Sequence, residues 1–217
     1  MAEKVRYHLE QTLPELEDLH KKGLFSRDEI ASISRRRTDF EHRINNRGST
    51  LLNYLKYAEY EINLDLLRKK RIARNSGPQR DSVASWAGHQ RILFIFDRAT
   101  KKFTSDLELW KQYIAYARQH KSRKVLVKIF RQLVRYLPAQ PIVWIWAAEH
   151  ELRDNSNRKA ARNLLLRGIS FNPNSRQLAD AHTRLEQDVI LALEQQKNQA
   201  ENEASIEPNK IEDKKDE

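Results

Sequence analysis

Apolar residues recur every three or four positions along almost the whole chain, with polar residues between them. This spacing places the apolar side chains on one face of an α-helix. Strict alternation of apolar and polar residues, which is typical of a half-buried strand, never extends beyond four residues. The sequence therefore predicts an all-α fold, with helices over residues 3–22, 27–46, 50–74, 86–102, 106–119, 122–137, 141–153, 157–170 and 175–197.

Several helix boundaries have recognisable residues. Ser26 with Glu29, and Ser105 with Glu108, have the spacing of a capping box, in which each side chain satisfies a backbone amide near the other residue. Pro14 falls inside the first predicted helix, so we expect a break or kink there.

A stripe of aromatic residues recurs with a period of about 34 residues and a second helix after each stripe. Trp110, Tyr113 and Tyr116 share one helix face, and Trp144 follows 34 residues after Trp110. The stripe positions, with the glutamates that follow them and the prolines that close the later repeats, are Tyr54, Tyr57, Tyr60, Glu61, Trp110, Tyr113, Tyr116, Trp144, Glu151, Glu186, Pro138 and Pro173.

Two helices in about 34 residues cannot bury their apolar faces alone, so neighbouring pairs must stack. This predicts a helical-hairpin solenoid. The order aromatic, Tyr, aromatic, Glu, with Arg98-Ala99 in the second helix, resembles the HAT (half-a-tetratricopeptide, TPR-like) repeat. Ala117 stands where that pattern expects Glu, and Ala147 where it expects Tyr.

The stripe has two interpretations. Exposed aromatic rings can stack on single-stranded bases, whereas rings spaced along a solenoid helix are usually interior packing. We favour packing. We likewise expect Glu61, Glu151 and Glu186 to make hydrogen bonds or ion pairs between neighbouring helices, not to act as catalytic acids.

Composition limits the class of protein. The 217 residues include no cysteine, which excludes disulfides and cysteine-based zinc sites. No apolar run approaches the ~18 residues of a membrane span, and the N-terminus has no signal-like apolar core. We therefore expect an intracellular, soluble protein without a membrane partner.

The chain divides into three predicted regions. Residues 1–48 form N-terminal helices, residues 49–197 form the solenoid with a Ser-, Gly- and Pro-containing loop insertion at 74–85, and residues 198–217 form an acidic, disordered tail. The net charge is +10, although the tail is acidic. A basic body suits contact with nucleic acid or with acidic proteins.

Three basic clusters are the candidate binding residues. Each is either a solvated face, a site for an acidic protein, or a site for phosphate, and phosphate binding would be sequence-independent and salt-dependent. The clusters are Arg35, Arg36 and Arg37; Arg68, Lys69, Lys70 and Arg71; and Lys121, Arg123 and Lys124.

Catalytic and metal-binding patterns are missing from the sequence. Seven histidines have no paired metal-ligand spacing, and there is no phosphate-binding glycine loop. We expect no catalytic, cofactor-binding or metal-binding residue, no small-molecule substrate and no enzymatic activity.

The N-terminal ninety residues contain more specific motifs. Leu13-Pro14-Glu15-Leu16-Glu17-Asp18-Leu19, Lys22-Gly23-Leu24-Phe25-Ser26, Arg37-Thr38-Asp39-Phe40-Glu41-His42-Arg43-Ile44 and Tyr57-Ala58-Glu59-Tyr60-Glu61 resemble the opening of the U3 small nucleolar RNA-associated protein 6 family. The resemblance extends from Tyr7 to Pro173.

The resemblance implies a scaffold subunit of the UTP-B complex in the small-subunit processome (90S pre-ribosome). It implies a nuclear, nucleolar protein that supports U3-dependent pre-rRNA processing, ribosome biogenesis and 18S rRNA maturation. The implied partners are WD-repeat propeller subunits of UTP-B, the U3 snoRNP and the pre-ribosomal RNA–protein particle. Two alternatives remain: a HAT-repeat scaffold in pre-mRNA splicing or 3′-end processing, and a direct, non-sequence-specific RNA-binding module.

Overall fold

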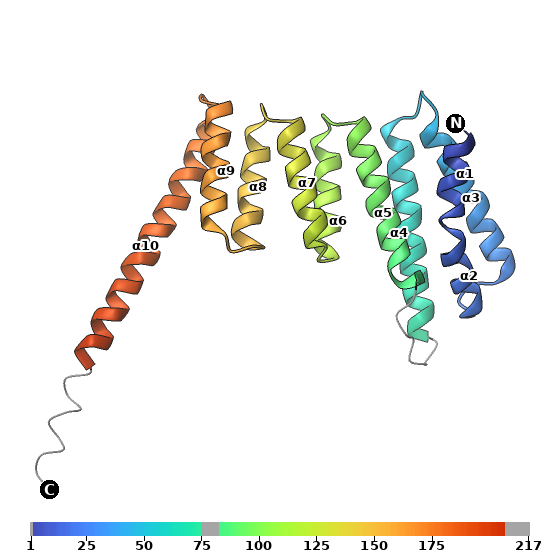
Figure 1. The fold of residues 1–217 in the computed structure, drawn as a ribbon, viewed down its shortest axis with the longest axis horizontal. Coiled ribbons are helices and arrows are strands. Elements are labelled where there is room, and N and C mark those ends of the chain that lie inside the picture. The colour runs from blue at the N-terminus through green and yellow to red at the C-terminus, as the bar shows by residue number, and fades with distance from the viewer. Residues whose placement is uncertain (1, 75–82, 207–217) are drawn as a thin grey trace, which may run out of the picture. The chain divides into compact units, whose positions relative to one another are not determined.

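The computed structural model describes residues 2–74 and 83–206, which form helices and loops without strands (Figure 1). The all-α, helical-repeat prediction is confirmed for these residues. The helices are α1 (Ala2–Glu10), α2 (Leu13–Lys21), α3 (Arg27–Asn45), α4 (Leu51–Arg74), α5 (Val83–Lys102), α6 (Leu107–Gln119), α7 (Arg123–Tyr136), α8 (Pro141–Arg153), α9 (Arg158–Phe171) and α10 (Arg176–Ile206).

Proline breaks the first predicted helix, as expected. Helix α1 ends at Glu10 and α2 begins at Leu13, which places Pro14 in the first turn of α2. A proline is tolerated there because its missing N–H would have no partner within the helix. The predicted single helix over residues 3–22 is therefore two helices.

One of the two predicted capping boxes is present. The Glu29 amide donates to Ser26 Oγ at 3.2 Å, and the Ser26 amide donates to Glu29 Oε2 at 2.8 Å. The box predicted at Ser105 is wrong. Asp106 caps α6 instead, accepting from the Leu109 amide at 3.0 Å, because the helix begins one residue later and Glu108 falls outside the required position.

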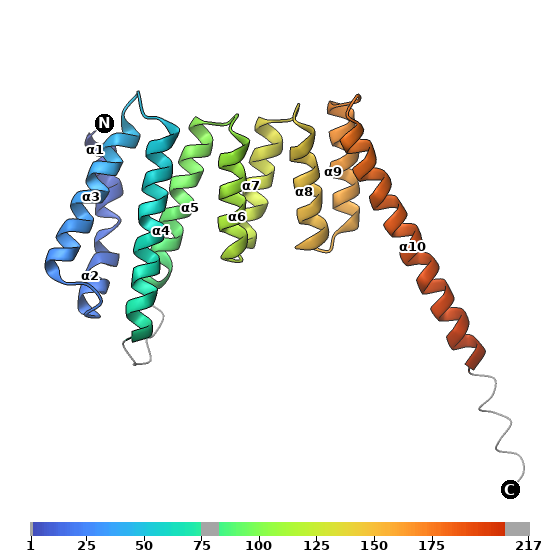
Figure 2. The ribbon, with the colours of Figure 1, turned by 180° about the vertical axis from the view of Figure 1, so that it is seen from behind.

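The chain divides into two compact units, Met1–Leu126 and Val127–Glu217, and the division falls within α7. In the first unit α4 packs on α5, and α5 on α6 and α2. Ring stacking links the repeat positions to the neighbouring helices, with 5.0 Å between the centroids of Phe40 and Tyr57. Figure 2 views this unit from the side of α4 and α6.

In the second unit α8 packs against α9 and α10. Its core consists of Trp144, Ala148, Ala161, Leu165, Leu178 and Leu185. Gly168 of α9 faces Trp144 so closely that an added Cβ would lie 2.8 Å from the indole Cγ. The absence of a side chain at this position is what lets the two helices approach.

The aromatic stripe is interior packing, as favoured above. Trp110, Tyr113 and Trp144 are each no more than 1% exposed, and Tyr116 is 8% exposed. The two indole N–H groups donate at 2.9 Å to equivalent carbonyls, Thr104 for Trp110 and Pro138 for Trp144. Buried rings with satisfied polar atoms are not available to stack on bases.

Two predicted regions lie partly outside the described residues. Residues 75–82 of the predicted loop insertion and residues 207–217 of the predicted tail belong to the undescribed part. Helix α10 continues to Ile206, nine residues beyond the predicted end at 197. The extension contains Gln, Ala and Glu residues, which have high intrinsic helix propensity.

Candidate functional site

A buried ion-pair network lies between α2, α3, α4 and α5 of the first unit. Arg37 Nε donates to Glu61 Oε1 at 2.8 Å, and its Nη1 donates to Glu15 Oε2 at 3.2 Å. Arg91 approaches Glu15 Oε2 at 2.6 Å from α5. Burial alone would raise the pKa of Glu15, but the Arg37 and Arg91 charges hold that pKa below its ordinary value. The network joins four helices and is structural.

This network corrects the first predicted binding cluster. Arg37 is fully buried, so it cannot contact RNA or an acidic partner. Arg35 and Arg36 are exposed, and the Arg36 guanidinium lies 5.9 Å from the Tyr60 ring centroid. Arg37 lies four residues after the buried Ile33, about one turn of α3. The two side chains therefore share the face of the helix that points to the core.

The second cluster is also divided by the structure. Arg68 is buried and donates to Asp65 Oδ1 at 2.7 Å. Arg71 donates to Glu29 Oε1 at 2.6 Å and to the Leu24 carbonyl at 2.7 Å. The Arg71 bonds join α4 to Leu24 and Glu29 at the start of α3, whereas Arg68 is held by Asp65 of its own helix.

The lysines of this cluster keep more contact with solvent. Lys69 pairs with Asp65 at 2.8 Å while its side chain is 49% exposed, and Lys70 is exposed. The Arg71 hydrogen bond, with the capping contact to Ser26, lowers the pKa of Glu29 to about 2. Only the two lysines of this cluster are therefore left in position for a phosphate or an acidic partner.

The third cluster, Lys121, Arg123 and Lys124, is exposed at the start of α7. Beneath it, the His89 Nε2 atom lies 2.7 Å from Ser122 Oγ, and His89 Nδ1 lies 3.2 Å from the Tyr116 hydroxyl. Burial lowers the pKa of His89 and of His120, whose rings are 4.6 Å apart. These histidines lie at the contact between α5 and α6. Ser122 and His89 are arranged as in a catalytic triad, but Tyr116 stands where a triad has a carboxylate.

The repeat glutamates make a recurring contact that is visible only in the structure. Arg37 Nε and Nη2 bind the two Glu61 oxygens, and Arg162 Nε and Nη2 bind the two Glu186 oxygens in the same way. The two residues of each pair are 24 positions apart. We call this bidentate contact the Arg–Glu clamp. The predicted interhelical role of Glu61 and Glu186 is confirmed.

The clamp is absent from the two middle repeats. The residue 24 positions before Ala117 is Leu93, and both are buried. The residue 24 positions before Glu151 is Val127, so Glu151 has no arginine and accepts from Asn155 Nδ2 at 2.9 Å instead. The interhelical contact predicted for Glu151 is therefore wrong.

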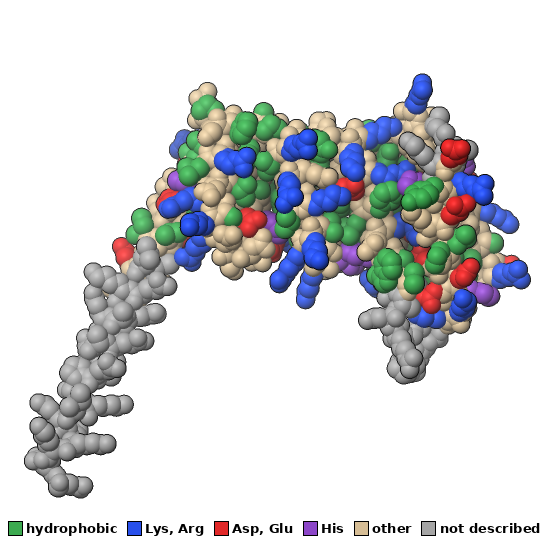
Figure 3. All heavy atoms as spheres, in the orientation of Figure 1, with side chains coloured by type: hydrophobic (Ala, Val, Ile, Leu, Met, Phe, Trp, Pro, Cys, Tyr) green, Lys and Arg blue, Asp and Glu red, His purple; other side chains and the backbone are tan. Residues whose placement is uncertain are grey.

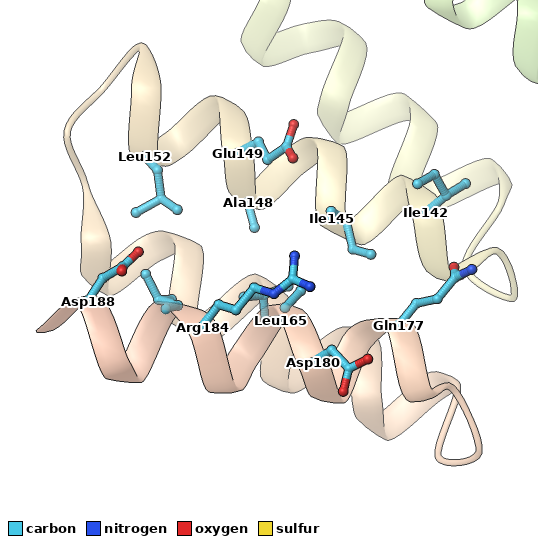
Figure 4. Close-up of a pocket in the computed structure, with 12 residues that line it drawn as sticks. Ile142, Ile145, Ala148, Glu149, Leu152, Leu165, Gln177, Asp180, Arg184 and Asp188 are labelled. Carbon is cyan, nitrogen blue, oxygen red and sulfur yellow. The ribbon is translucent and has the colours of Figure 1, made fainter. Parts of the chain in front are cut away.

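Two grooves flank α8 in the second unit. One, of about 400 Å³, lies between α8 and α10 (Figure 4). Its floor is apolar at Ile145 and Ala148, and Arg184 extends from α10 toward α8. Three carboxylates, Glu149, Asp180 and Asp188, also line it, so its charge is on balance acidic.

The other groove, of about 540 Å³, lies between α7 and α9 over the opposite side of α8. We call it the α7–α9 groove. It is lined by three arginines, Arg131, Arg135 and Arg167, and by apolar residues that include Val127 and Phe171. None of the three basic clusters predicted from the sequence contains these arginines, although Arg131 and Arg135 are four residues apart and so share a helix face.

No group of three or more histidines, aspartates and glutamates that could hold a metal ion occurs among the described residues. Nor does any helix in this part of the chain have the length and apolar content needed to cross a membrane.

Comparison with known proteins identifies relatives of this chain. A model of the family "U3 small nucleolar RNA-associated protein 6" matches residues 9–91. The protein of that name from Schizosaccharomyces pombe is 40% identical over 186 residues, which cover 86% of this chain and 38% of that protein. The Homo sapiens homolog is 33% identical over 187 residues, covering 86% of this chain and 31% of the relative.

A third relative is also matched over most of this chain and less than a third of its own length. The Dictyostelium discoideum homolog is 32% identical over 176 residues, or 81% of this chain and 29% of the relative. The chain thus spans between 29% and 38% of the length of these curated relatives. The shared identity over most of the chain, together with the family match, shows that the chain belongs to the U3 small nucleolar RNA-associated protein 6 family.

Proposed function

We propose that the chain is a non-catalytic scaffold of ribosome biogenesis, acting in the nucleolus within the small-subunit processome. Its relatives are named for association with U3 small nucleolar RNA. That name supports a place beside the U3 snoRNP or the pre-ribosomal particle, in the pathway of pre-rRNA processing and 18S rRNA maturation.

The finer part of the proposal is that HAT-type repeats dock WD-repeat propeller subunits of the UTP-B complex. The observation that supports it is an apolar surface at the rim of a cavity of about 410 Å³ between α1, α2 and α5. Trp86 and Phe94 line this cavity, yet they are 52% and 42% exposed. Exposed aromatic residues grouped in this way are typical of protein-binding sites.

Affinity purification of the tagged chain, with and without nuclease, followed by mass spectrometry and RNA detection, tests the proposal. We expect propeller proteins and U3 RNA to copurify, and nuclease to release the RNA but not the propellers. The double variant Trp86→Ala/Phe94→Ala should lose the propellers. Leu52→Ala, at an equally exposed residue that does not line the cavity, should keep them.

Two results would overturn the proposal. Copurification of splicing or 3′-end cleavage factors without U3 RNA would place this HAT-type architecture in pre-mRNA processing. Release of every protein partner by nuclease would mean that RNA alone connects the chain to the assembly, which contradicts docking through an apolar surface.

A further inference from the structure

The α7–α9 groove is a concave, positively charged surface without an assigned role. Its floor is the α8 stripe of Trp144, Ala147, His150 and Glu151, and its walls come from α7 and α9. Figure 3 shows the same side as Figure 1, with Lys and Arg side chains set among hydrophobic ones over α7 and α9. A volume of about 540 Å³ lies within the ~300–1,000 Å³ typical of ligand sites.

The three arginines of the groove differ from the arginines that link helices. Arg37, Arg71 and Arg162 are held by carboxylates from other helices. In the described part of the chain, Arg131, Arg135 and Arg167 make no ion pair, and all three are exposed. Their guanidinium groups are therefore free to bind an anion, and the planar fork of five N–H donors suits phosphate oxygens.

Two polar residues, His150 and Glu151, lie in the floor of the groove. One ring nitrogen of His150 has no hydrogen-bond partner, and Glu151 has no arginine partner. His150 is 1% exposed, its Nδ1 atom lies 2.6 Å from Asp154 Oδ2, and its Nε2 atom is buried with no hydrogen-bond partner. Glu151 occupies the clamp position without an arginine, because Val127 stands where the clamp has Arg37 or Arg162. Glu151 accepts one hydrogen bond, from Asn155, and its carboxylate keeps capacity for further donors.

An aromatic ring completes the groove. Phe171, at the end of α9, is 59% exposed although it lines the groove. It stacks on the buried Trp144 at 5.5 Å between centroids with the planes 19° apart. Trp144 thus supports one face of the phenyl ring, and the rest of the ring can stack on a base.

We infer that the α7–α9 groove binds single-stranded RNA. Phosphates bind Arg131, Arg135 and Arg167, one base stacks on Phe171, and the edge of a base faces Glu151. A carboxylate accepts a hydrogen bond from the exocyclic amine of a base such as cytosine, and uracil has no such amine, so cytidine is preferred over uridine. An acidic peptide would also suit the arginines, but its carboxylates offer Glu151 no hydrogen-bond donor and Phe171 no base to stack on.

This inference does not depend on the proposed scaffold function. The scaffold is judged by nuclease-resistant copurification of proteins, whereas the groove is judged by RNA binding of the purified chain. Each can fail while the other holds.

Fluorescence anisotropy of the full 217-residue chain with a labelled, cytidine-rich 12-nucleotide RNA tests the groove, at several salt concentrations. The triple variant Arg131→Gln/Arg135→Gln/Arg167→Gln should weaken binding at least tenfold. It should also reduce the slope of log affinity against log salt by about 2, since each lost phosphate contact on a single strand contributes ~0.7.

The matched control removes the same number of charges elsewhere. Lys121→Gln/Arg123→Gln/Lys124→Gln, in the sequence-predicted cluster of the first unit, should change affinity less than threefold. Equal weakening by both triple variants would show diffuse charge attraction and would overturn the inference.

The stacking contact has its own variants. Phe171→Ala should weaken binding about tenfold, as loss of one stacked base predicts, whereas Phe171→Tyr should retain it. Circular dichroism melting separates this loss from unfolding, since Phe171 also covers Trp144. Glu151→Gln should reduce the preference for cytidine over uridine RNA. Tighter binding of a glutamate-rich peptide than of RNA would identify the groove as a protein-docking site and contradict the inference.

Discussion

At the scale of single residues, Arg37 links three helices of the first unit, because it binds carboxylates of two other helices while fully buried. We expect Arg37→Met to lower the free energy of unfolding by about 3–5 kcal/mol, since Arg91 alone would remain for Glu15 and Glu61, leaving one buried negative charge uncompensated. Urea unfolding followed by circular dichroism measures the change. Arg35→Met, at an exposed position two residues earlier, should stay within about 0.5 kcal/mol of the parent chain. An equal effect at both positions would contradict the role of the network.

The same network predicts the effect of acid. The folded-state pKa of Glu15 is depressed below 4.5, so its contribution is present above that pH and is lost as the pH falls through the folded value. Unfolding free energy should therefore decrease as the pH falls below about 4.5. Glu15→Gln should flatten this dependence when unfolding is measured at a series of pH values. Glu17→Gln, on the exposed side of the same helix, should keep the parental slope.

The burial of individual charged residues was the feature least predictable from the sequence. Three consecutive arginines, Arg35 to Arg37, read as one basic cluster, although Ile33, Arg37 and Glu41 all lie on the buried side of one helix. The spacing was in the sequence, but the partners Glu15 and Glu61 come from other helices. Only tertiary structure shows that a buried arginine has two carboxylates to neutralise it.

At the scale of the helix, the capping residues distinguish two serines with the same sequence signature. Ser26→Ala should cost about 1 kcal/mol of stability because it removes the acceptor for the Glu29 amide. Ser105→Ala should change stability by less than about 0.5 kcal/mol, since Asp106 caps α6. Thermal or urea unfolding of both variants tests the assignment, and the reverse order of effects would refute it.

The contact between α8 and α9 depends on one glycine. Gly168→Ala would place a Cβ atom 2.8 Å from Trp144 Cγ and 3.2 Å from Leu178 Cδ2, and no rotamer can relieve a clash at Cβ. We expect destabilisation by about 1–3 kcal/mol from overpacking. The control is Gly48→Ala, where nothing lies within 4 Å and the effect on unfolding should be small. A neutral Gly168→Ala would mean that the two helices separate without cost.

Helices were the most predictable level of this structure. The 3.6-residue periodicity and the prolines set most boundaries within one or two residues, from α3 to α9. The end of α10 was not predictable in this way, because residues beyond 197 have no apolar stripe and only intrinsic helix propensity supports them. The start of α6 shifted for a local reason, the competition of Asp106 with Ser105 for the cap.

At the scale of the whole molecule, the repeat recognised in the sequence as aromatic positions is also a repeat of contacts. Arg37 with Glu61 in the first unit, and Arg162 with Glu186 in the second, form the clamp, and 24 residues separate each pair. The glutamates were visible as repeat positions, but their arginine partners lie outside the aromatic frame. The α7–α9 groove was missed for this reason: it lies where one repeat keeps its glutamate and replaces the arginine with Val127.

This equivalence predicts that a missing clamp can be restored. Val127→Arg should place a guanidinium beside Glu151, because Val127 is 38% exposed and leaves room for the longer side chain. The pair would be partly exposed, so we expect a coupling free energy of roughly 0.5–1 kcal/mol. A double-mutant cycle of Val127→Arg and Glu151→Gln, measured by urea unfolding, isolates that coupling from other effects of each substitution. A matching cycle of Arg162→Val and Glu186→Gln should show a favourable coupling in the native clamp. If the native pair couples and the introduced pair does not, Val127 and Arg162 are not equivalent. If both couple, Val127 occupies the arginine position of the clamp, and the α7–α9 groove lies where that arginine is replaced by valine.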